Sequence, residues 1–493
     1  MVGRILLYLN RNVKIKICVF IGLIFLLLTG PTSADTIEVD NGGEGDYKSI
    51  QKAINNSNPG DTVLVYPGTY KENIVVDREL RIISKSRNPE DTIVLAATQK
   101  EHVFKVASDN VTIRGFKIKD ASGIPGNYKY GIYLDGTKNC IIDNNYISNN
   151  REGILLIDSS NNTLINNKLP KNNDAGIILR SSDHNTVRSN HASGNIAGIL
   201  IIYSSANNTI DGNTVSENTI GIEIQGNNNT IRNNTILDNE KYGIGIESSA
   251  DNAISNNTVN LNKRNGILIG FSKNNTLKNN TINFNGMDGI FLLYSNNNTV
   301  NGNNASNNVN HGIGLMDCDY NILNNNFVNR NNANGIHLWN EGTEIDDDAI
   351  FEWGGSGDNI LSNNTASNNT AYGIYIGISS DNNMLKNNSI YSNGKYGIFL
   401  AEASRNNELE DNSIDSNQLG KVLVSSDDTL IGSSELSTPE GSSQEMGKEP
   451  GTRLREMPFN GCFMTIATVG MASIIMKRKR DKRPDLEKQD KWL

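Results

Sequence analysis

A Gly-Ile pair returns about every 22 or 23 residues along most of this chain. A fixed period of this length indicates one supersecondary unit repeated along an axis. Gly420, followed by Lys421 and Val422, keeps the phase once more. The period therefore constrains the fold before any catalytic motif is considered. The pairs begin at Gly131, Gly153, Gly176, Gly198, Gly221, Gly243, Gly266, Gly289, Gly312, Gly335, Gly373 and Gly397.

Each repeat contains short apolar runs that are separated by Asn and Gly. In the repeat that starts at Gly153, the apolar positions are Ile154, Leu156, Leu164 and Leu169. Alternation over short runs is typical of β-strands, and no helical period is present. The pattern predicts an all-β fold, a single-stranded parallel β-helix with three strands per coil and about 13 regular coils; its right-handed sense is implied by the family resemblance described below. A bundle of helices or a β-sandwich would not require an equal repeat length.

One Asn recurs at an equivalent place in twelve repeats. Asn tolerates left-handed backbone, and its amide can bond both within its own coil and to the next coil. The pattern predicts a ladder of stacked amides, with a polar binding strip as the alternative. The ladder residues are Asn145, Asn167, Asn190, Asn213, Asn234, Asn257, Asn280, Asn303, Asn326, Asn364, Asn388 and Asn412.

The N-terminal part of the chain departs from the repeat. Residues 1–34 combine basic residues, an apolar run and Thr-Ser-Ala, as in a secretory signal peptide. An uncleaved membrane anchor is the alternative. Residues 35–130 are expected to hold an N-terminal cap and the first coils, in which Ser49 to Asn55 has apolar residues at helical spacing. Such a capping helix would cover an otherwise unpaired sheet edge. The regular β-helix follows over residues 131–432.

The C-terminal part predicts attachment to a membrane. Residues 433–457 are rich in Ser, Glu, Gly and Pro and predict a disordered stalk. Residues 458–476 are mostly apolar and predict a transmembrane anchor, with a buried tail as the alternative. The basic residues within 477–493 place the tail inside. These features predict export to the cell surface with the C-terminus in the cytoplasm.

The net charge bears on the partners. The formal net charge is -9 although both ends of the chain are basic, so the part between them is strongly acidic. An acidic surface repels polyanions, and a nucleic-acid partner is therefore disfavoured.

Two segments near the N-terminus carry a family resemblance. Tyr47 to Ile54 (YKSIQKAI) and Pro67 to Ile74 (PGTYKENI), together with the repeat, resemble the pectin lyase-like superfamily of right-handed β-helices. The group that is most similar comprises NosD-type periplasmic copper-binding and carbohydrate-binding or sugar-hydrolysis repeat proteins, which are common on archaeal surfaces. The resemblance covers roughly residues 36–430. It implies the fold, whereas activity in the superfamily ranges from lyases to inert surface proteins.

The resemblance to copper-binding proteins implies a copper site, and the positions of the histidines bear on this implication. A copper site needs several His, Met or Cys side chains in one place. The five histidines are scattered, and the last two alone lie in adjacent repeats, so copper is disfavoured. They are His102, His184, His191, His311 and His337.

One insertion interrupts the period. Gly335 and Gly373 are separated by an extra loop, Asn340 to Asp358, which is rich in acidic residues. Its carboxylates could hold Ca²⁺ or supply an acid and a base for glycosidic cleavage; the alternative is a solvated acidic loop. The loop contains no recognisable catalytic motif. The catalytic candidates are Asp346, Asp347, Asp348 and His337, and the metal candidates are Asp317, Asp319, Glu344, Asp346, Asp347 and Asp348.

Aromatic residues recur at outward positions of the repeat. Aromatic rings on an exposed sheet can stack on sugar rings, and exposed apolar strips usually mark interaction surfaces. Coverage by the loop, the stalk or a neighbouring chain is the alternative. The predicted ligand-binding residues are Tyr133, Tyr203, Phe271, Phe291, Tyr294, Trp339, Tyr375 and Phe399.

Asn-x-Ser/Thr sequons are frequent, and on an exported chain some of them are candidate glycosylation sites. Asn-Asn-Thr is also the natural turn sequence of this repeat, which inflates their number. The candidates include Asn110, Asn161, Asn207, Asn233, Asn279, Asn297 and Asn368.

These observations lead to one hypothesis and two alternatives. The hypothesis is a cell-surface anchored β-helix protein that binds carbohydrate or other envelope components without catalysis. The first alternative is a polysaccharide lyase or glycoside hydrolase that acts at the 340–358 loop. The second is a NosD-like copper-handling protein.

Overall fold

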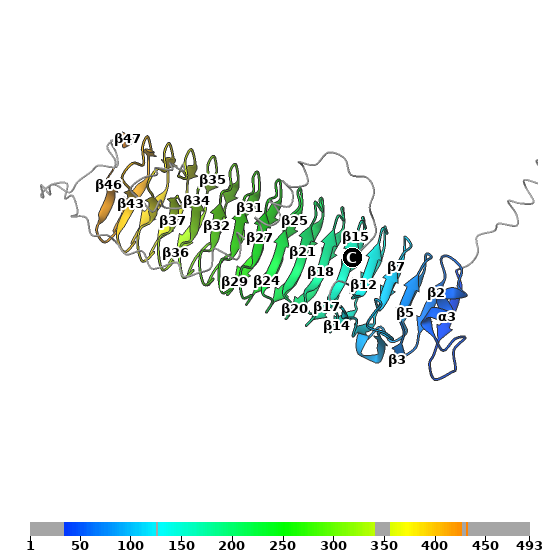
Figure 1. The fold of residues 1–493 in the computed structure, drawn as a ribbon. Coiled ribbons are helices and arrows are strands. Elements are labelled where there is room, and N and C mark those ends of the chain that lie inside the picture. The colour runs from blue at the N-terminus through cyan, green and yellow to red at the C-terminus, as the bar shows by residue number, and fades with distance from the viewer. Residues whose placement is uncertain (1–33, 125–126, 341–354, 426–429, 432–493) are drawn as a thin grey trace, which may run out of the picture. The chain divides into compact units, whose positions relative to one another are not determined.

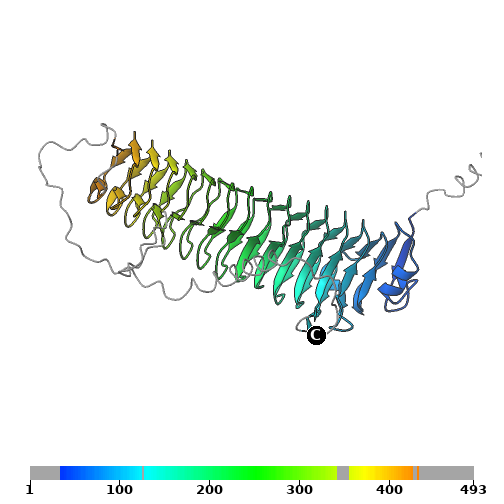
Figure 2. The same cartoon turned by 45° about the horizontal axis from the view of Figure 1, so that its top comes forward.

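The computed structural model describes residues 34–124, 127–340, 355–425 and 430–431. Short parallel strands stack along one axis in three sheets, and successive coils follow one another from the N-terminal to the C-terminal end (Figures 1 and 2). We call the three sheets A, B and C. Each regular coil contributes a strand first to sheet C, then to sheet A and then to sheet B, and the chain continues into the next coil. The predicted all-β parallel β-helix is confirmed. Thirteen of the 15 strands of sheet C, from β12 (Tyr130–Asp135) to β46 (Gly420–Val424), lie in the regular repeats.

Sheet A contains 17 strands. They are β1 (Thr36–Val39), β2 (Thr62–Val65), β5 (Arg81–Ser84), β8 (Thr112–Arg114), β13 (Ile141–Asp143), β16 (Thr163–Ile165), β19 (Thr186–Arg188), β22 (Thr209–Asp211), β25 (Thr230–Arg232), β28 (Ala253–Ser255), β31 (Thr276–Lys278), β33 (Thr299–Asn301), β35 (Ile322–Asn324), β38 (Ile360–Ser362), β41 (Met384–Lys386), β44 (Glu408–Glu410) and β47 (Leu430–Ile431).

Sheet B consists of nine strands and, after two coils joined by single bridges, four more. They are β3 (Gly68–Lys71), β6 (Thr92–Leu95), β9 (Lys117–Lys119), β14 (Tyr146–Ser148), β17 (Lys168–Pro170), β20 (His191–Ser193), β23 (Thr214–Ser216), β26 (Thr235–Leu237), β29 (Thr258–Asn260), β36 (Phe327–Asn329), β39 (Thr365–Ser367), β42 (Ser389–Tyr391) and β45 (Ser413–Asp415). A small antiparallel pair, β10 (Gly123–Ile124) and β11 (Asn127–Tyr128), and a 3₁₀ turn, η1 (Pro89–Asp91), lie outside the three sheets.

Sheet C contains the longest strands of the regular coils. They are β4 (Ile74–Val76), β7 (Phe104–Val106), β12 (Tyr130–Asp135), β15 (Glu152–Ile157), β18 (Ala175–Arg180), β21 (Ala197–Ile202), β24 (Ile220–Ile224), β27 (Ile244–Glu247), β30 (Ile267–Gly270), β32 (Ile290–Leu293), β34 (Ile313–Met316), β37 (Ile336–Trp339), β40 (Ile374–Ile376), β43 (Tyr396–Leu400) and β46 (Gly420–Val424).

The core is a continuous stack of identical positions. Ile154 pairs in register with Ile177, and Leu156 pairs with Leu179; all four side chains are fully buried. The repeat glycine is required because it also faces inward. A Cβ added to Gly153 would lie 2.5 Å from the backbone oxygen of Gly176 in the next coil. Close packing between neighbouring coils thus explains why Gly recurs before Ile in each repeat.

Three amide ladders line the turns. The predicted ladder is confirmed: the side-chain nitrogen of Asn167 donates to Oδ1 of Asn190 at 3.0 Å and to the carbonyl oxygen of Ile142 at 2.8 Å. Two further ladders, not singled out from the sequence, run from Asn162 to Asn407 and from Asn150 to Asn417. A row of Ser hydroxyls follows sheet C, with Cys318 as one of its members. These ladders satisfy polar groups that the turns bury.

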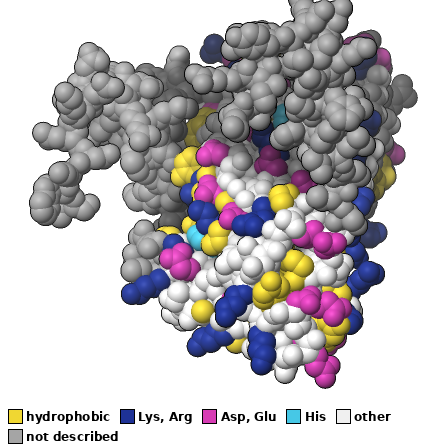
Figure 3. All heavy atoms as spheres, turned by 90° about the vertical axis from the view of Figure 1, so that its right-hand side faces the viewer, with side chains coloured by type: hydrophobic (Ala, Val, Ile, Leu, Met, Phe, Trp, Pro, Cys, Tyr) yellow, Lys and Arg dark blue, Asp and Glu magenta, His cyan; other side chains and the backbone are white. Residues whose placement is uncertain are grey.

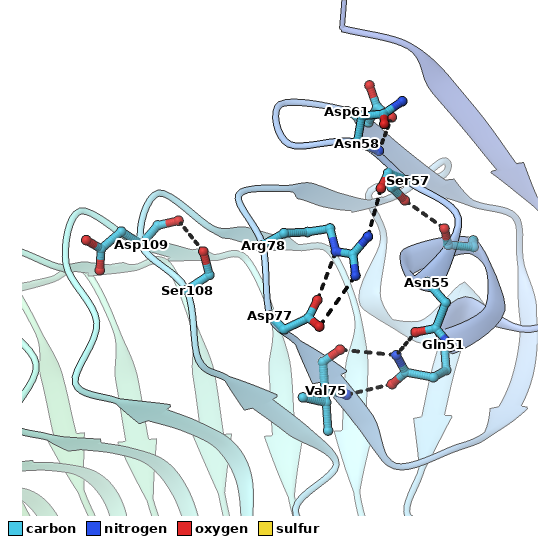
Figure 4. A network of polar contacts seen from close by, with 11 residues as sticks. Gln51, Asn55, Ser57, Asn58, Asp61, Val75, Asp77, Arg78, Ser108 and Asp109 are labelled. Carbon is cyan, nitrogen blue, oxygen red and sulfur yellow. Dashed lines mark hydrogen bonds and ion pairs between the residues drawn. The ribbon is translucent and has the colours of Figure 1, made fainter.

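A six-residue helix, α3 (Ile50–Asn55), forms where the sequence predicted one, and it buries Ile50, Ala53 and Ile54. Glu72 accepts hydrogen bonds from the backbone nitrogens of Ile50 and Gln51 at the start of the helix. The side-chain amide of Gln51 bonds both backbone groups of Val75, in the first strand of sheet C (Figure 4). The amide thus takes the place of a neighbouring strand at this point, while capping of the whole core stays a prediction.

The surface at this end mixes charges of both signs with scattered hydrophobic side chains (Figure 3). One of its ion pairs joins Arg78 to Asp77, and Arg78 also donates to the carbonyl oxygen of Ser57 (Figure 4). Charged side chains of this kind discourage pairing of sheet edges between molecules.

Among the residues that the structure describes, no helix is both long enough and apolar enough to cross a membrane. The predicted stalk 433–457, anchor 458–476 and tail 477–493 lie outside the described residues, as do nearly all of the signal 1–34 and most of the 340–358 loop. Those assignments stay predictions.

Candidate functional site

A line of outward-facing residues crosses five neighbouring strands of sheet C. The parallel register places Phe291 of β32, Gly314 of β34, His337 of β37, Tyr375 of β40 and Phe399 of β43 directly beside one another. Three of these five residues are aromatic and one is an imidazole. Because register in a sheet is set by its buried face, the inward residues determine which outward residues are neighbours along this line.

The rings along this line contact each other without a break. Phe291 stacks on Trp339 with centroids 5.6 Å apart, and Trp339 stacks on His337 at 4.3 Å. His337 meets the edge of Tyr375 at 4.6 Å, and Tyr375 stacks on Phe399 at 4.8 Å. We define the aromatic row as the five residues whose rings are in contact, namely Phe291, Trp339, His337, Tyr375 and Phe399.

Gly314 has no side chain, and this leaves room for the Trp339 ring to reach Phe291. A Cβ at this position would lie 3.0 Å from two carbons of the Trp339 ring and 3.4 Å from Phe291. The indole therefore occupies the place of a missing side chain and bridges two coils to reach Phe291. Sequence reasoning missed Gly314, although this register position holds Gly in only two repeats, at Gly245 and Gly314, which was a visible signal.

Beside the row, His311 and His337 are hydrogen-bonded through their rings. Nε2 of His311 lies 3.0 Å from Nδ1 of His337, and Nδ1 of His311 accepts from the backbone nitrogen of Asn334 at 3.2 Å. Since Nδ1 of His311 is an acceptor, its Nε2 carries the proton of the neutral ring and donates to His337. His337 then holds its own proton on Nε2.

His311 is also one rung of a polar ladder on the outer edge of sheet C. Its backbone nitrogen donates to Oδ1 of Asp288 at 2.9 Å, and the nitrogen of Asp288 donates in turn to Oδ1 of Asn265. Burial lowers the pKa of His311 to about 3 and raises that of Asp288 to about 7. Burial, aided by the neighbouring His311, lowers the pKa of His337 well below its usual value. Both rings are therefore neutral near pH 7.

The geometry of this pair does not suit copper. Both ring nitrogens of His311 are engaged, and the ring hydrogen bond occupies the free lone pair of His337. Nowhere in the described residues do three or more His, Cys, Asp or Glu side chains gather in a way that could hold a metal ion. A copper site needs several free nitrogen or sulfur ligands converging on one point. We therefore derive no copper chemistry from these residues.

The predicted carboxylate site can be followed only in part. Asp319 accepts a hydrogen bond from the backbone nitrogen of Gly357 at 2.9 Å, and burial raises its pKa. Asp317 lies in the left-handed turn that follows β34. Glu344, Asp346, Asp347 and Asp348 lie outside the described residues, so the calcium and catalytic hypotheses for the loop stay predictions. The end of the insertion is regular, since Ser356 resumes the Ser row at the backbone nitrogen of Cys318.

The other predicted aromatic residues do not join the row. Phe271 and Tyr294 stack on each other at 5.2 Å, but both adopt left-handed backbone in the turn after sheet C. Tyr203 lies in an equivalent turn and packs on the guanidinium of Arg180 at 5.2 Å. All three residues therefore lie in turns and outside the strands of sheet C, and ligand binding by them stays a prediction.

Tyr133 belongs to a second, smaller cluster near the N-terminal end of sheet C. His102 stacks on Tyr130 at 4.9 Å and contacts Tyr133 at 4.6 Å. Burial lowers the pKa of His102 to about 4. Sequence reasoning missed both partners of Tyr133, and it also missed Tyr372, which contacts Tyr375 and Phe399. Tyr130 and Tyr372 occupy the position just before the repeat glycine, where Tyr242 and Tyr396 also lie.

Comparison with known proteins gives relatives of low identity. A cell surface glycoprotein of Methanothermus fervidus is 33% identical over 105 residues, which are 21% of this chain and 16% of that protein. This chain therefore matches about a sixth of its curated relative.

Solved structures with a similar fold include the A-module of the mannuronan C-5 epimerase AlgE6 from Azotobacter vinelandii. It has a TM-score of 0.40 and 15% identity, over 78% of this chain and 94% of that one. The catalytic domain of a GH87 α-1,3-glucanase has a TM-score of 0.39 and 14% identity, over 82% and 68% of the two chains. Likeness at this level carries nothing about activity.

Two family models match the chain. A model described as right handed beta helix region covers residues 220–352. A model described as periplasmic copper-binding protein (NosD) covers residues 54–241 and 349–433, more than half of the sequence. The chain belongs to the NosD family of β-helix proteins.

Proposed function

We propose that this chain is an exported cell-surface protein that binds an envelope polysaccharide through the aromatic row of sheet C and does not cleave it. The observation that carries the proposal is the unbroken contact of five rings from Phe291 to Phe399. Export is supported by the description of the family as periplasmic and by the similarity to a cell surface glycoprotein.

Four rings of the row, those of His337, Trp339, Tyr375 and Phe399, are partly exposed, while Phe291 is 8% exposed and closes one end of the row. A hexose ring presents an apolar face of C–H groups that packs on an aromatic ring, while its hydroxyls stay in contact with water. Rings on consecutive coils are spaced by about 4.8 Å. A linear polymer can therefore contact several of them at once, and each weak contact adds to the others. A row of this kind suits a chain of sugars better than a single small ligand.

The described groups near the row favour binding over cleavage. His337 lies within the row, but its Nδ1 is hydrogen-bonded to His311 and its lowered pKa makes it a poor base. One carboxylate oxygen of Asp319 is held by the backbone of Gly357. Asp288 bonds the backbone of His311, and its raised pKa reflects burial. These three groups have structural partners, and they do not form an acid–base pair around an open space.

Co-sedimentation of the purified full-length chain with a panel of insoluble polysaccharides tests the proposal. Tyr375→Ala and Phe399→Ala each remove one ring of the row and should weaken retention about fivefold, which corresponds to about 1 kcal/mol. Tyr391→Ala is the matched control, because this ring is 38% exposed and lies in sheet B, off the row. The proposal is wrong if all three variants bind like the unchanged chain, or if new reducing ends appear in the retained polysaccharide.

A further inference from the structure

Most of the Asn-x-Ser/Thr sequons lie at two of the three corners of the coil. Six precede a strand of sheet A, at the corner between sheet C and sheet A, and five precede sheet B, at the corner between sheet A and sheet B. The first group is Asn110, Asn161, Asn207, Asn228, Asn274 and Asn297. The second group is Asn233, Asn256, Asn279, Asn363 and Asn387.

All eleven acceptor residues share one conformation. Each is exposed and adopts left-handed backbone, with φ between 54° and 60°. Protruding turns with exposed Asn side chains are the sites at which N-glycans attach to folded proteins. The corners therefore present the acceptors outward in two rows along the β-helix.

The second and third residues of each sequon explain this exposure. In the sequon that begins at Asn161, the middle residue is Asn162, which belongs to an amide ladder and is buried. Thr163 opens β16 and remains partly exposed. Since the ladder fixes the middle residue inside the turn, Asn161 must lie on the outer rim. The neighbouring coils carry Asn139 and His184 at this place, neither of which begins a sequon, so no second glycan would crowd Asn161.

The third corner, between sheet B and sheet C, is different. Its left-handed positions include Lys171, Glu217, Asp238, Leu261, Phe284 and Arg330, as well as Asn149 and Asn307, which begin no sequon. Among its described residues Asn368 alone begins a sequon. Here the ladder Asn is followed by further turn residues before the strand of sheet C begins. The sequons thus border sheet A on both sides and leave one border of sheet C open.

We infer that the exported chain carries N-linked glycans along both borders of sheet A, whereas the corner between sheet B and sheet C stays free of such a row. Attachment joins the side-chain nitrogen of Asn161 to the anomeric carbon of an activated sugar phosphate. The bond from that carbon to the phosphate leaving group breaks, and the amide proton goes to the released phosphate. Glycans at these positions would cover sheet A and leave the aromatic row approachable from the side of sheet B. The inference rests on the export part of the proposed function.

Glycopeptide mass mapping of the full chain, produced in an archaeal host that exports and N-glycosylates a reporter protein, tests the inference. The peptide with Asn161 should carry a glycan mass. Asn161→Gly, which keeps the left-handed turn, and Thr163→Val, which keeps the β-branched shape, should both remove it. Thr163→Ser preserves the sequon and should retain the glycan. An unmodified Asn161 peptide beside a modified reporter overturns the inference, as does a mass that survives Thr163→Val.

The distribution over the corners gives a second readout from the same sample. Modified peptides should map to the two rows, with Asn368 as the sole candidate at the third corner. Glycans on one row but absent from the other would contradict the inference of two borders. This result is independent of polysaccharide binding, since a chain that binds no polysaccharide can still be glycosylated. Failure of export is recognised separately, because the chain would then be recovered inside the cells.

Discussion

Sheet A and sheet C have similar inner faces and different outer faces. Inside, both present a stack of fully buried aliphatic residues, such as Leu164 and Val187 in sheet A and Ile154 and Ile177 in sheet C. On the outer face of sheet A, the first residue of each strand is mostly Thr. On the outer face of sheet C, the position two residues after the repeat glycine is mostly aromatic from Phe291 to Phe399. Coil stacking selects the inner residues, and β-branched Thr suits an exposed strand. The packing of coils explains the inner residues and the Thr positions, but it does not explain why the aromatic row lies on the outer face of sheet C.

The largest expected effect tests the shared interior. Asn257 donates to the carbonyl oxygen of Ile231 and accepts from both the backbone and the side chain of Asn234. Asn257→Ala leaves these buried groups without partners and should destabilise the protein by about 3 kcal/mol in urea unfolding. Asn256→Gly is the control, because Asn256 is exposed in a left-handed turn that Gly adopts freely. Equal free energies of unfolding for the two variants would show that the hydrogen bonds of the ladder do not contribute to stability.

A second test concerns contact between neighbouring coils. A Cβ at Gly266 would collide with Ile282 and would lie 2.7 Å from the backbone oxygen of Gly289. Gly266→Ala should therefore cost about 2 kcal/mol by overpacking. Gly270 is the last residue of β30, which begins directly after Gly266, and Gly270→Ala places its Cβ where no atom is found within 4 Å. Thermal unfolding of the two variants should differ clearly; similar midpoints would mean that the Gly-Ile period reflects something other than close packing.

The outer edge of sheet C should respond to acid in a way that sheet A does not. The pKa of His311 is lowered to about 3, so the unfolded chain binds a proton that the folded chain rejects between about pH 6.5 and pH 3. His311 therefore weakens stability progressively as the pH falls through this window. His311→Asn keeps the outer ladder, which already contains Asn265 and Asn334. Urea midpoints between pH 7 and pH 4 should show the variant gaining relative to the unchanged chain.

That comparison isolates His311 from Asp288, whose raised pKa acts in the opposite direction because its folded form retains a proton up to about pH 7. A constant difference between His311→Asn and the unchanged chain across the pH range would contradict the buried, neutral state of the ring.

Smaller effects are expected where the two outer faces are altered directly. Gly314→Ala should push the Trp339 ring away from its place beside Phe291 and lower polysaccharide retention two- to threefold, about 0.5 kcal/mol. Thr186→Val on sheet A should leave both retention and stability unchanged within about 0.5 kcal/mol. A larger loss of retention on sheet A than on sheet C would reverse the assignment of the binding face.

The sequence predicted the interior better than the outer faces, for a physical reason. Inward residues such as Ile154 and Leu156 repeat because each must pack on its neighbour, so the period alone reveals them. Among the Asn residues, the ladder of Asn167 was recognised, but Asn162 and Asn172 were not separated from turn residues such as Asn161. Both kinds are Asn, and a ladder amide differs from a turn amide in backbone conformation and burial, which the residue type does not reveal.

Outer residues have no such repeated partner, so their directions depended on local details. Phe291, Tyr375 and Phe399 share a face because they occupy the same register position. Phe271 and Tyr294 were expected there too, but their left-handed backbone turns them into the corner. Contact of Trp339 with Phe291 required the empty space at Gly314, which acts between coils and has no periodic signal.

The emission of Trp339 during polysaccharide titration tests the central claim most directly. The chain has three Trp residues, so Trp353→Phe and Trp492→Phe together leave Trp339 as the single reporter. The account predicts a saturable change in emission over the same concentrations that give co-sedimentation, with both signals weakened about fivefold in Phe399→Ala. Undiminished co-sedimentation without any change in Trp339 emission would show that the polysaccharide binds elsewhere.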